Sequence, residues 1–289
     1  MKIGSETHKE LFCRSFIASH LEYEPEHIPW PDLDSVTLDR LRGIPFWQIA
    51  LETERKAGTL VGAYAETVSD PVLREAIALQ SMEETRHGRL IETLIKHYGI
   101  EITVPTASAL PSNIEQAFTT FGFEECLDSF FAFGLFGIAR QAGFFPEQFF
   151  TIFDPILDEE ARHIVFFVNW VTYLQISRHQ GFIMLRSAKS LRHYGGALRN
   201  IFKAVGKSDT NGAGFTATGA SAFAIDLTPE MFLLACLEEN ARRMSRFDDR
   251  LLQPQLMPAL ATAALGTLQF FPRLKPRTER IQQIASNKP

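Results

Sequence analysis

Two short segments of the chain carry the same pairing of a carboxylate and an imidazole. Glu84 is followed three residues later by His87, and Glu160 by His163, each within a Glu-Glu-x-Arg-His pentapeptide. Residues three apart lie on one face of a helix, so each pair presents an oxygen and a nitrogen ligand side by side. Carboxylate oxygens with one imidazole per ion suit iron or manganese, whereas cysteine- or histidine-rich sets would suit zinc or copper.

Two single glutamates complete the predicted ligand set because of their distance from the turns. A break at Ser69-Asp70-Pro71 and another at Gly143 divide this region into two helical hairpins. In an antiparallel hairpin, residues equidistant from the turn lie opposite each other, which pairs Glu54 with Glu84 and Glu125 with Glu160. A pair of metals held by four carboxylates and two histidines between helices is therefore expected. The predicted metal ligands are Glu54, Glu84, His87, Glu125, Glu160 and His163.

Two of these assignments have a neighbouring competitor. Glu54 shares its helix face with small and apolar residues, whereas Glu52 faces Gln48, Arg55 and Lys56, so Glu54 is preferred. Glu125 is preferred in the same way, with Glu124 left open as the alternative.

The residues flanking the ligands predict supporting contacts. Glu83 and Glu159 precede the two histidines by four residues, so each can approach the imidazole N–H of its own segment and fix the ring. Arg86 and Arg162 would offset the added negative charge.

The elements that position these residues are predicted to be helices throughout, so the fold class is all-α. A four-helix bundle with one long crossover is expected, with extra N- and C-terminal helices. Ser112 and Glu115 form a capping box that predicts the start of the third bundle helix. The expected helices span about 5–19, 46–68, 71–98, 112–142 and 146–180, with the crossover over 100–112.

The rest of the chain is predicted to be a C-terminal helical extension, 181–289, of a single domain spanning 1–289 around a bundle core of about 46–180. Within it we expect a basic helix over 182–205, a mobile loop over 206–227 that covers the approach to the site, and a helix over about 228–247.

Composition removes several classes of function. The chain has 289 residues and a net charge of -5, which gives no reason to expect nucleic acid as a partner. Its three cysteines are scattered, which argues against a disulfide framework or a zinc ribbon and fits a cytoplasmic location. The N-terminus lacks an apolar signal core, and the longest apolar run is too short to span a membrane.

The two pentapeptides resemble those of the ferritin-like di-iron carboxylate superfamily. They look most like the signature of its oxygen-activating members, such as the hydroxylase subunits of bacterial multicomponent monooxygenases. The stretches Met82 to His87 and Glu125-Cys126 are also similar to those of cyanobacterial aldehyde-deformylating oxygenases, although the helix spacings differ. The resemblance covers roughly residues 46–170 and implies the same six ligands, Glu54, Glu84, His87, Glu125, Glu160 and His163, around two iron ions, with manganese or a mixed pair as alternatives.

The chain also departs from known branches of that superfamily. Ribonucleotide reductase radical subunits carry a tyrosine where this chain has Ile91, so a tyrosyl-radical role is not expected. Some di-iron N-oxygenases add a histidine where this chain has Ile156, so a seventh ligand is not expected either. Ferritins are much shorter and usually lack the histidine of the second motif.

Phenylalanine is the abundant residue around the predicted site. Fourteen of the 25 phenylalanines lie between Phe118 and Phe167. Most must be core, but a few, with Phe121, Phe131, Phe166 and Phe167 as candidates, are expected to wall an apolar channel to the metals.

These features predict a non-haem di-iron oxygenase or oxidase acting with dioxygen on a small organic or fatty substrate, served by an external electron donor. An iron-handling ferroxidase and a helical protein with a vestigial site remain alternatives, and a homodimer is one candidate assembly. An apolar cavity beside the ligands would favour the oxygenase.

Overall fold

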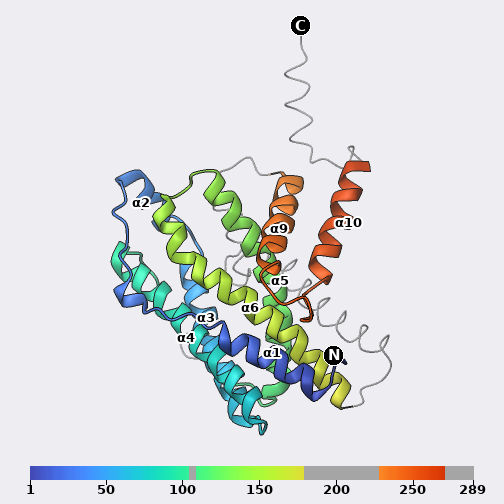
Figure 1. The fold of residues 1–289 in the computed structure, drawn as a ribbon. Coiled ribbons are helices and arrows are strands. Elements are labelled where there is room, and N and C mark those ends of the chain that lie inside the picture. The colour runs from blue at the N-terminus through green and yellow to red at the C-terminus, as the bar shows by residue number, and fades with distance from the viewer. Residues whose placement is uncertain (104–108, 179–227, 271–289) are drawn as a thin grey trace.

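The protein is described by a computed structural model over residues 1–103, 109–178 and 228–270. Every regular element in these ranges is a helix, and no strand occurs in them (Figure 1). The all-α prediction is therefore confirmed for this part of the chain. The helices are α1 Glu6–Ala18, η1 Pro25–His27, α2 Ser35–Arg42, α3 Trp47–Thr67, α4 Pro71–Tyr98, α5 Ile114–Gln141, α6 Glu147–Ser177, α9 Pro229–Met244 and α10 Leu256–Phe270.

Four long helices, α3 to α6, form two hairpins whose turns lie where the sequence predicts them. Asp70 caps α4 by accepting a hydrogen bond from the Leu73 amide, and Pro71 occupies the first turn, where its missing N–H costs nothing. The second hairpin turns at Gly143, which adopts φ +60°, a left-handed conformation that favours glycine. The expected bounds of α3, α4 and α6 agree with the structure to within three residues.

The two hairpins pack against each other, with α3 beside α5 and α4 in contact with α6 (Figure 1). One buried cluster fills the α3–α4 turn end, around Phe118, Phe167 and Trp170. A second fills the opposite end, around Trp47, Leu94 and Phe149. The helix faces that meet between these clusters carry the predicted ligands, so the site lies at mid-height between two apolar ends.

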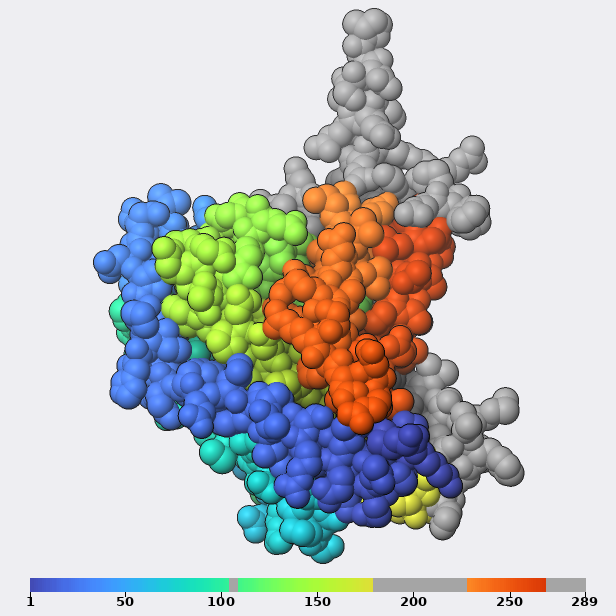
Figure 2. Space-filling model, in the orientation of Figure 1, coloured from blue at the N-terminus to red at the C-terminus, as the bar shows by residue number. Residues whose placement is uncertain are grey.

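The remaining helices brace this unit from outside. α1 lies across α4 and α6, where Phe12 and Phe16 meet Phe166 at ring-centre distances of 5.5 and 5.0 Å. α9 lies along α5, with Phe232 stacked on Phe131. Figure 2 shows the N-terminal segment and the C-terminal helices covering separate parts of one face, with α6 between them. None of the described helices is both long and apolar enough to cross a membrane.

Some sequence-based expectations differ from the structure. Asn113, not Ser112, caps α5, because its side chain accepts from the Gln116 amide, so the predicted capping box is wrong by one residue. The short helix α2 was not predicted; its cap is Asp34, which accepts from the Thr37 amide. The helix expected over about 228–247 is α9, and Thr228 caps it. The predicted basic helix 182–205, the loop 206–227 and part of the crossover lie outside the described residues.

Candidate metal centre

The structure brings the six predicted ligands into two overlapping groups between the hairpins. Glu54, Glu84, His87 and Glu160 each offer one ligand atom within 4.8 Å of the others, and so do Glu84, Glu125, Glu160 and His163. Glu84 and Glu160 belong to both groups. The arrangement is therefore two adjacent sites that share two carboxylates, each with one further glutamate and one histidine.

The same ring nitrogen of each histidine faces the carboxylates. Nδ1 of His87 lies 3.3 Å from Glu160 and 3.5 Å from Glu54. Nδ1 of His163 lies 3.1 Å from Glu84 and 3.9 Å from Glu160. The two rings are 5.8 Å apart between centres. Each imidazole thus points its Nδ1 atom into the carboxylate cluster.

The donor set fits a pair of divalent cations. Both Nδ1 atoms are buried and make no hydrogen bond, although an unsatisfied buried polar atom is costly. A metal ion within each group would use that nitrogen and the surrounding oxygens. Four carboxylates would also offset the charge of two divalent ions, which is how buried charges of one sign are tolerated.

The competing glutamates lie elsewhere. Glu52 accepts a hydrogen bond from Gln48 and pairs with Lys56 at 3.7 Å, away from both groups. Glu124 is in neither group, whereas the adjacent Glu125 is in one. The structure therefore places the preferred residue of each pair, Glu54 and Glu125, at the site.

The supporting glutamates are exchanged relative to the prediction. Nε2 of His87 lies 2.8 Å from Glu159, and Nε2 of His163 lies 2.9 Å from Glu83. Each carboxylate thus holds the histidine of the other hairpin, so the expected contact within one segment is wrong. A spacing of four residues brings Glu83 close to His87, and Glu159 close to His163, along one helix. The carboxylates of Glu83 and Glu159 instead reach across the bundle to the histidine of the other hairpin.

The arginines follow the same crossed pattern. Arg86 pairs with Glu159, and Arg162 lies 2.7 Å from Glu83. These guanidinium groups balance the buried Glu83 and Glu159 carboxylates, as the prediction required. Although burial acts in the opposite direction, the hydrogen bond from His163 and the charge of Arg162 lower the pKa of Glu83.

The segment after α1 contacts Glu83 and Glu159 from outside the bundle, and no pattern in the sequence indicates these contacts. Tyr23 donates a hydrogen bond to Glu159 at 3.0 Å, and its ring lies 4.1 Å below the Arg86 guanidinium. His20 contacts Glu83 at 2.6 Å. Two chains of contacts therefore lead inward from this segment, through Tyr23 to His87 and through His20 to His163.

Gln80 is a further residue that sequence analysis missed. Its amide donates to Glu84 at 3.2 Å and to Glu125 at 3.4 Å, so it links one shared ligand to one unshared ligand. Its position one turn before Glu84 on α4 is the signal that could have identified it. Its carbonyl oxygen is buried and has no partner.

The electrostatics of the cluster favour cations. Burial raises the pKa of Glu54 to about 7, and burial together with the charges of Glu84 and Glu160 raises that of Glu125 well above its usual range. Burial opposes charging of His163, yet Glu84 and Glu83 raise its pKa to about 10. Cations that bind these groups must displace any protons that the groups hold.

An elongated cavity of about 190 Å³ adjoins the cluster. Its wall includes Glu54, Glu84, Glu125 and Glu160, and beyond them it is mostly aromatic and aliphatic. It follows α3, α5 and α6 toward the turn between α5 and α6. Ile91 and Ile156 are part of this apolar wall.

The aromatic wall differs from the predicted one. Of the four candidates only Phe121 lines the cavity. Phe131 packs on Phe232. Phe166 and Phe167 belong to the buried cluster at the α3–α4 turn end. The residues that line it instead come from the second apolar end of the bundle. They are Phe46, Phe136, Phe145, Phe149, Phe150 and Phe153. No described residue of α9 or α10 is among the lining residues.

Comparison with protein families, with curated proteins and with solved structures finds no match for this chain.

Proposed function

We propose that the protein is a non-haem di-iron oxygenase or oxidase that acts with dioxygen on a small, largely apolar substrate. The observation that supports this best is the cavity: one wall is built from four of the six proposed ligands, and the rest is aromatic and aliphatic. A protein that only stores or oxidises iron does not need an apolar chamber beside its metals, because its substrate is an ion.

The roles of the chain's own residues follow from their contacts. Glu84 and Glu160 would be shared by two ions, with Glu54 and His87 on one side and Glu125 and His163 on the other. Glu159 and Glu83 hold the imidazoles through Nε2 and so fix which nitrogen is free to bind. Gln80 holds the Glu84 and Glu125 carboxylates in relation to each other.

The apolar wall would exclude water and orient the substrate. Phe136, Phe153 and Ile156 offer an occupant apolar contacts, so it would present its carbons toward the carboxylates. Two bound iron ions would supply the one-electron and dioxygen chemistry that side chains lack. An external electron donor is part of the proposal, since the chain contains no redox-active cysteine pair.

The test uses full-length protein loaded with ferrous iron without oxygen. It is then exposed to ¹⁸O₂ with a reductant and a panel of alkanes, alkanols and aldehydes. Oxidised products in the wild type and none in Glu54→Ala are the expected result, with ¹⁸O in the products of an oxygenase.

Three other results would overturn the proposal. Iron oxidation without any organic product would favour an iron-handling protein. Failure to bind iron or manganese would favour a vestigial site. Equal activity in Glu54→Ala would place the chemistry elsewhere.

A further inference from the structure

A second, larger hollow adjoins the apolar cavity. It is an open groove of about 1000 Å³ between α3, α4 and α5. Four residues line both the groove and the inner cavity, and we call them the neck: Thr53, Ala57, Phe121 and Glu124. The neck is thus where the surface and the inner chamber meet.

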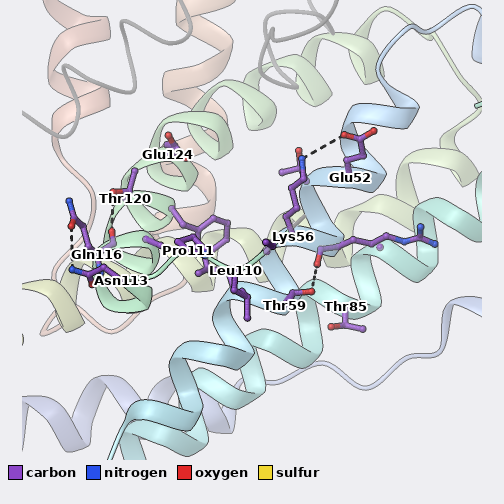
Figure 3. Close-up of a pocket in the computed structure, with 18 of the residues that line it drawn as sticks. Glu52, Lys56, Thr59, Thr85, Leu110, Pro111, Asn113, Gln116, Thr120 and Glu124 are labelled. Carbon is purple, nitrogen blue, oxygen red and sulfur yellow. Dashed lines mark hydrogen bonds and ion pairs between the residues drawn. The ribbon is translucent and has the colours of Figure 1, made fainter. Parts of the chain in front are cut away.

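The character of the lining changes at the neck. Figure 3 shows Lys56 and Thr59 on α3 and Gln116, Thr120 and Glu124 on α5, with Leu110 and Pro111 between them. More than half of the residues that line the groove are polar or charged, whereas the chamber beyond the neck is lined mostly by apolar residues. A molecule that occupies both would need a polar end at the neck and an apolar body inside.

Glu124 is the polar group best placed for that end. It has no hydrogen bond or ion pair within the described part of the chain. The cations of the groove are engaged elsewhere, Arg55 with Glu92 at 2.9 Å and Arg89 with Glu24 at 2.9 Å. Since a half-buried carboxyl group that lacks a partner is costly, a ligand that donates a hydrogen bond there would gain affinity.

The chamber runs away from the neck along the bundle. Successive turns of α5 supply Glu124, Asp128, Ala132, Phe136 and Ala139 to its wall. A helix rises about 1.5 Å per residue, so the first and last of these lie ~22 Å apart along its axis. A volume of about 190 Å³ along such a length favours one unbranched chain.

We propose that the neck is the entrance of the chamber and that Glu124 determines specificity. The ligand class is an unbranched alkyl compound with a hydrogen-bond donor, such as a primary hydroxyl group, at one end. It binds with the donor at Glu124 and its chain pointing toward Phe149. Since Glu124 and Glu125 both line the chamber, the carbons nearest the polar end lie beside the proposed metals. This inference rests on the proposed function only in taking the chamber as the substrate site.

The test compares two ligands of equal size on the full-length protein. Octan-1-ol donates a hydrogen bond, whereas 1-methoxyheptane has the same number of heavy atoms and only accepts. Calorimetry should show that the wild type prefers the alcohol by about three- to tenfold, the range of one net hydrogen bond. Glu124→Leu should abolish this preference, and Glu124→Gln, which keeps an acceptor, should retain part of it.

Two further variants test the entrance itself. Ala57→Leu narrows the neck and should slow association, whereas Phe121→Ala widens it and should speed association. The change in tryptophan emission on binding, recorded in stopped flow, can follow both, because Trp47 lines the chamber. Glu66→Leu, an exposed position of α3 outside both linings, is the control for a glutamate-to-leucine change.

The inference is overturned if the wild type binds the two ligands with equal affinity or if the preference for the alcohol survives in Glu124→Leu. It is also overturned if neither neck variant changes the association rate. Melting temperature and metal content of each variant separate these results from misfolding. If the protein shows the expected binding preference but performs no oxygen chemistry, only the proposed function is contradicted. Oxygen chemistry without the preference would sink this inference alone.

Discussion

The carboxylate of Glu159 lies 2.8 Å from Nε2 of His87, a residue of the other hairpin. Its counterpart Glu83 contacts His163 in the same way, so each hairpin orients the nitrogen ligand of its partner. Docking of the two hairpins and ordering of the site are thus one event. The contact also determines which imidazole nitrogen is available, because a ring that donates from Nε2 keeps Nδ1 for the cluster.

The crossed contact predicts a specific pattern of coupling between variants. Glu159→Gln should weaken metal affinity about 10- to 100-fold, as is typical when the partner of a ligating histidine is changed. Combined with His87→Ala it should cost little more than His87→Ala alone, since both changes act on one ring. Combined with His163→Ala it should add its full effect. Chelator competition measures the affinities of the wild type, the three single variants and the two double variants. Coupling to His163 instead of His87 would contradict the crossed assignment.

Metal content is the most direct measure of the two proposed sites. Purified protein should contain about two iron or manganese ions per chain. His87→Ala and His163→Ala should each remove at least one ion, because each takes the only nitrogen from one group. Elemental analysis of protein purified under identical conditions gives the stoichiometry. Unchanged content in both variants would refute the ligand assignment.

The choice of glutamate on α3 can be tested with a matched pair. Glu54→Ala removes a carboxylate that lies 3.5 Å from His87, and it should lose metal. Glu52→Ala removes one that pairs with Lys56 at the surface, and it should keep its metal. Both changes remove the same side chain from the same helix, so differences in helix propensity cancel. The reverse outcome would show that Glu52, and not Glu54, lies on the face of α3 that binds the metal.

Much of the site could be predicted because it depends on local periodicity. Glu84 and His87 share a face through helix geometry alone, and the turn at Ser69 to Pro71 determines which residue of α3 lies opposite. These relationships need only the sequence and the position of two breaks. The ends of the bundle helices followed from Asp70, Pro71 and Gly143 for the same reason.

The contacts that sequence analysis missed depend on how the helices rotate and pack. Spacing shows that Glu159 is near the turn of His163, but not that its side chain crosses to His87. The approach of Tyr23 to Glu159 joins residues 136 positions apart, for which no periodic signal exists. The wall of the cavity was mispredicted likewise, since phenylalanine abundance does not distinguish Phe153 from Phe166.

The ion pair between Lys9 and Asp70 predicts a pH dependence of stability outside the site. Although burial opposes it, the Lys9 contact and the Leu73 amide lower the pKa of Asp70. A lowered carboxyl pKa stabilises the fold above the unfolded value near 4, and this stabilisation is lost as pH falls through the lower folded pKa.

Asp70→Asn isolates the charge, because asparagine can still cap α4. At pH 7 it should reduce the free energy of unfolding by about 1–2 kcal/mol, a usual value for a hydrogen bond to a charged group. The difference from wild type should hold between pH 7 and pH 5 and shrink below about pH 4. Urea denaturation at each pH measures it. A difference that grows toward acid would show that the carboxylate charge is not the stabilising element.

The contact between α5 and α9 predicts how the C-terminal helices depend on one glycine. A Cβ atom on Gly134 would lie 2.7 Å from the backbone nitrogen of Cys236 and 2.8 Å from its Cα. Backbone atoms cannot rotate away, so α9 would have to shift as a whole. The clash in Gly134→Ala should therefore lower the free energy of unfolding by about 1–3 kcal/mol. The higher helix propensity of alanine should offset part of this loss.

Gly266 on α10 supplies the matched control, because a Cβ there meets nothing within 4 Å. Gly266→Ala should be neutral or raise the free energy of unfolding by up to about 1 kcal/mol. Urea denaturation compares the two variants. Since α9 supplies no ligand and no wall of the chamber, Gly134→Ala should keep its metal content even as its stability falls. Loss of metal in Gly134→Ala would show that docking of α9 helps to hold the ligands of α5 in place.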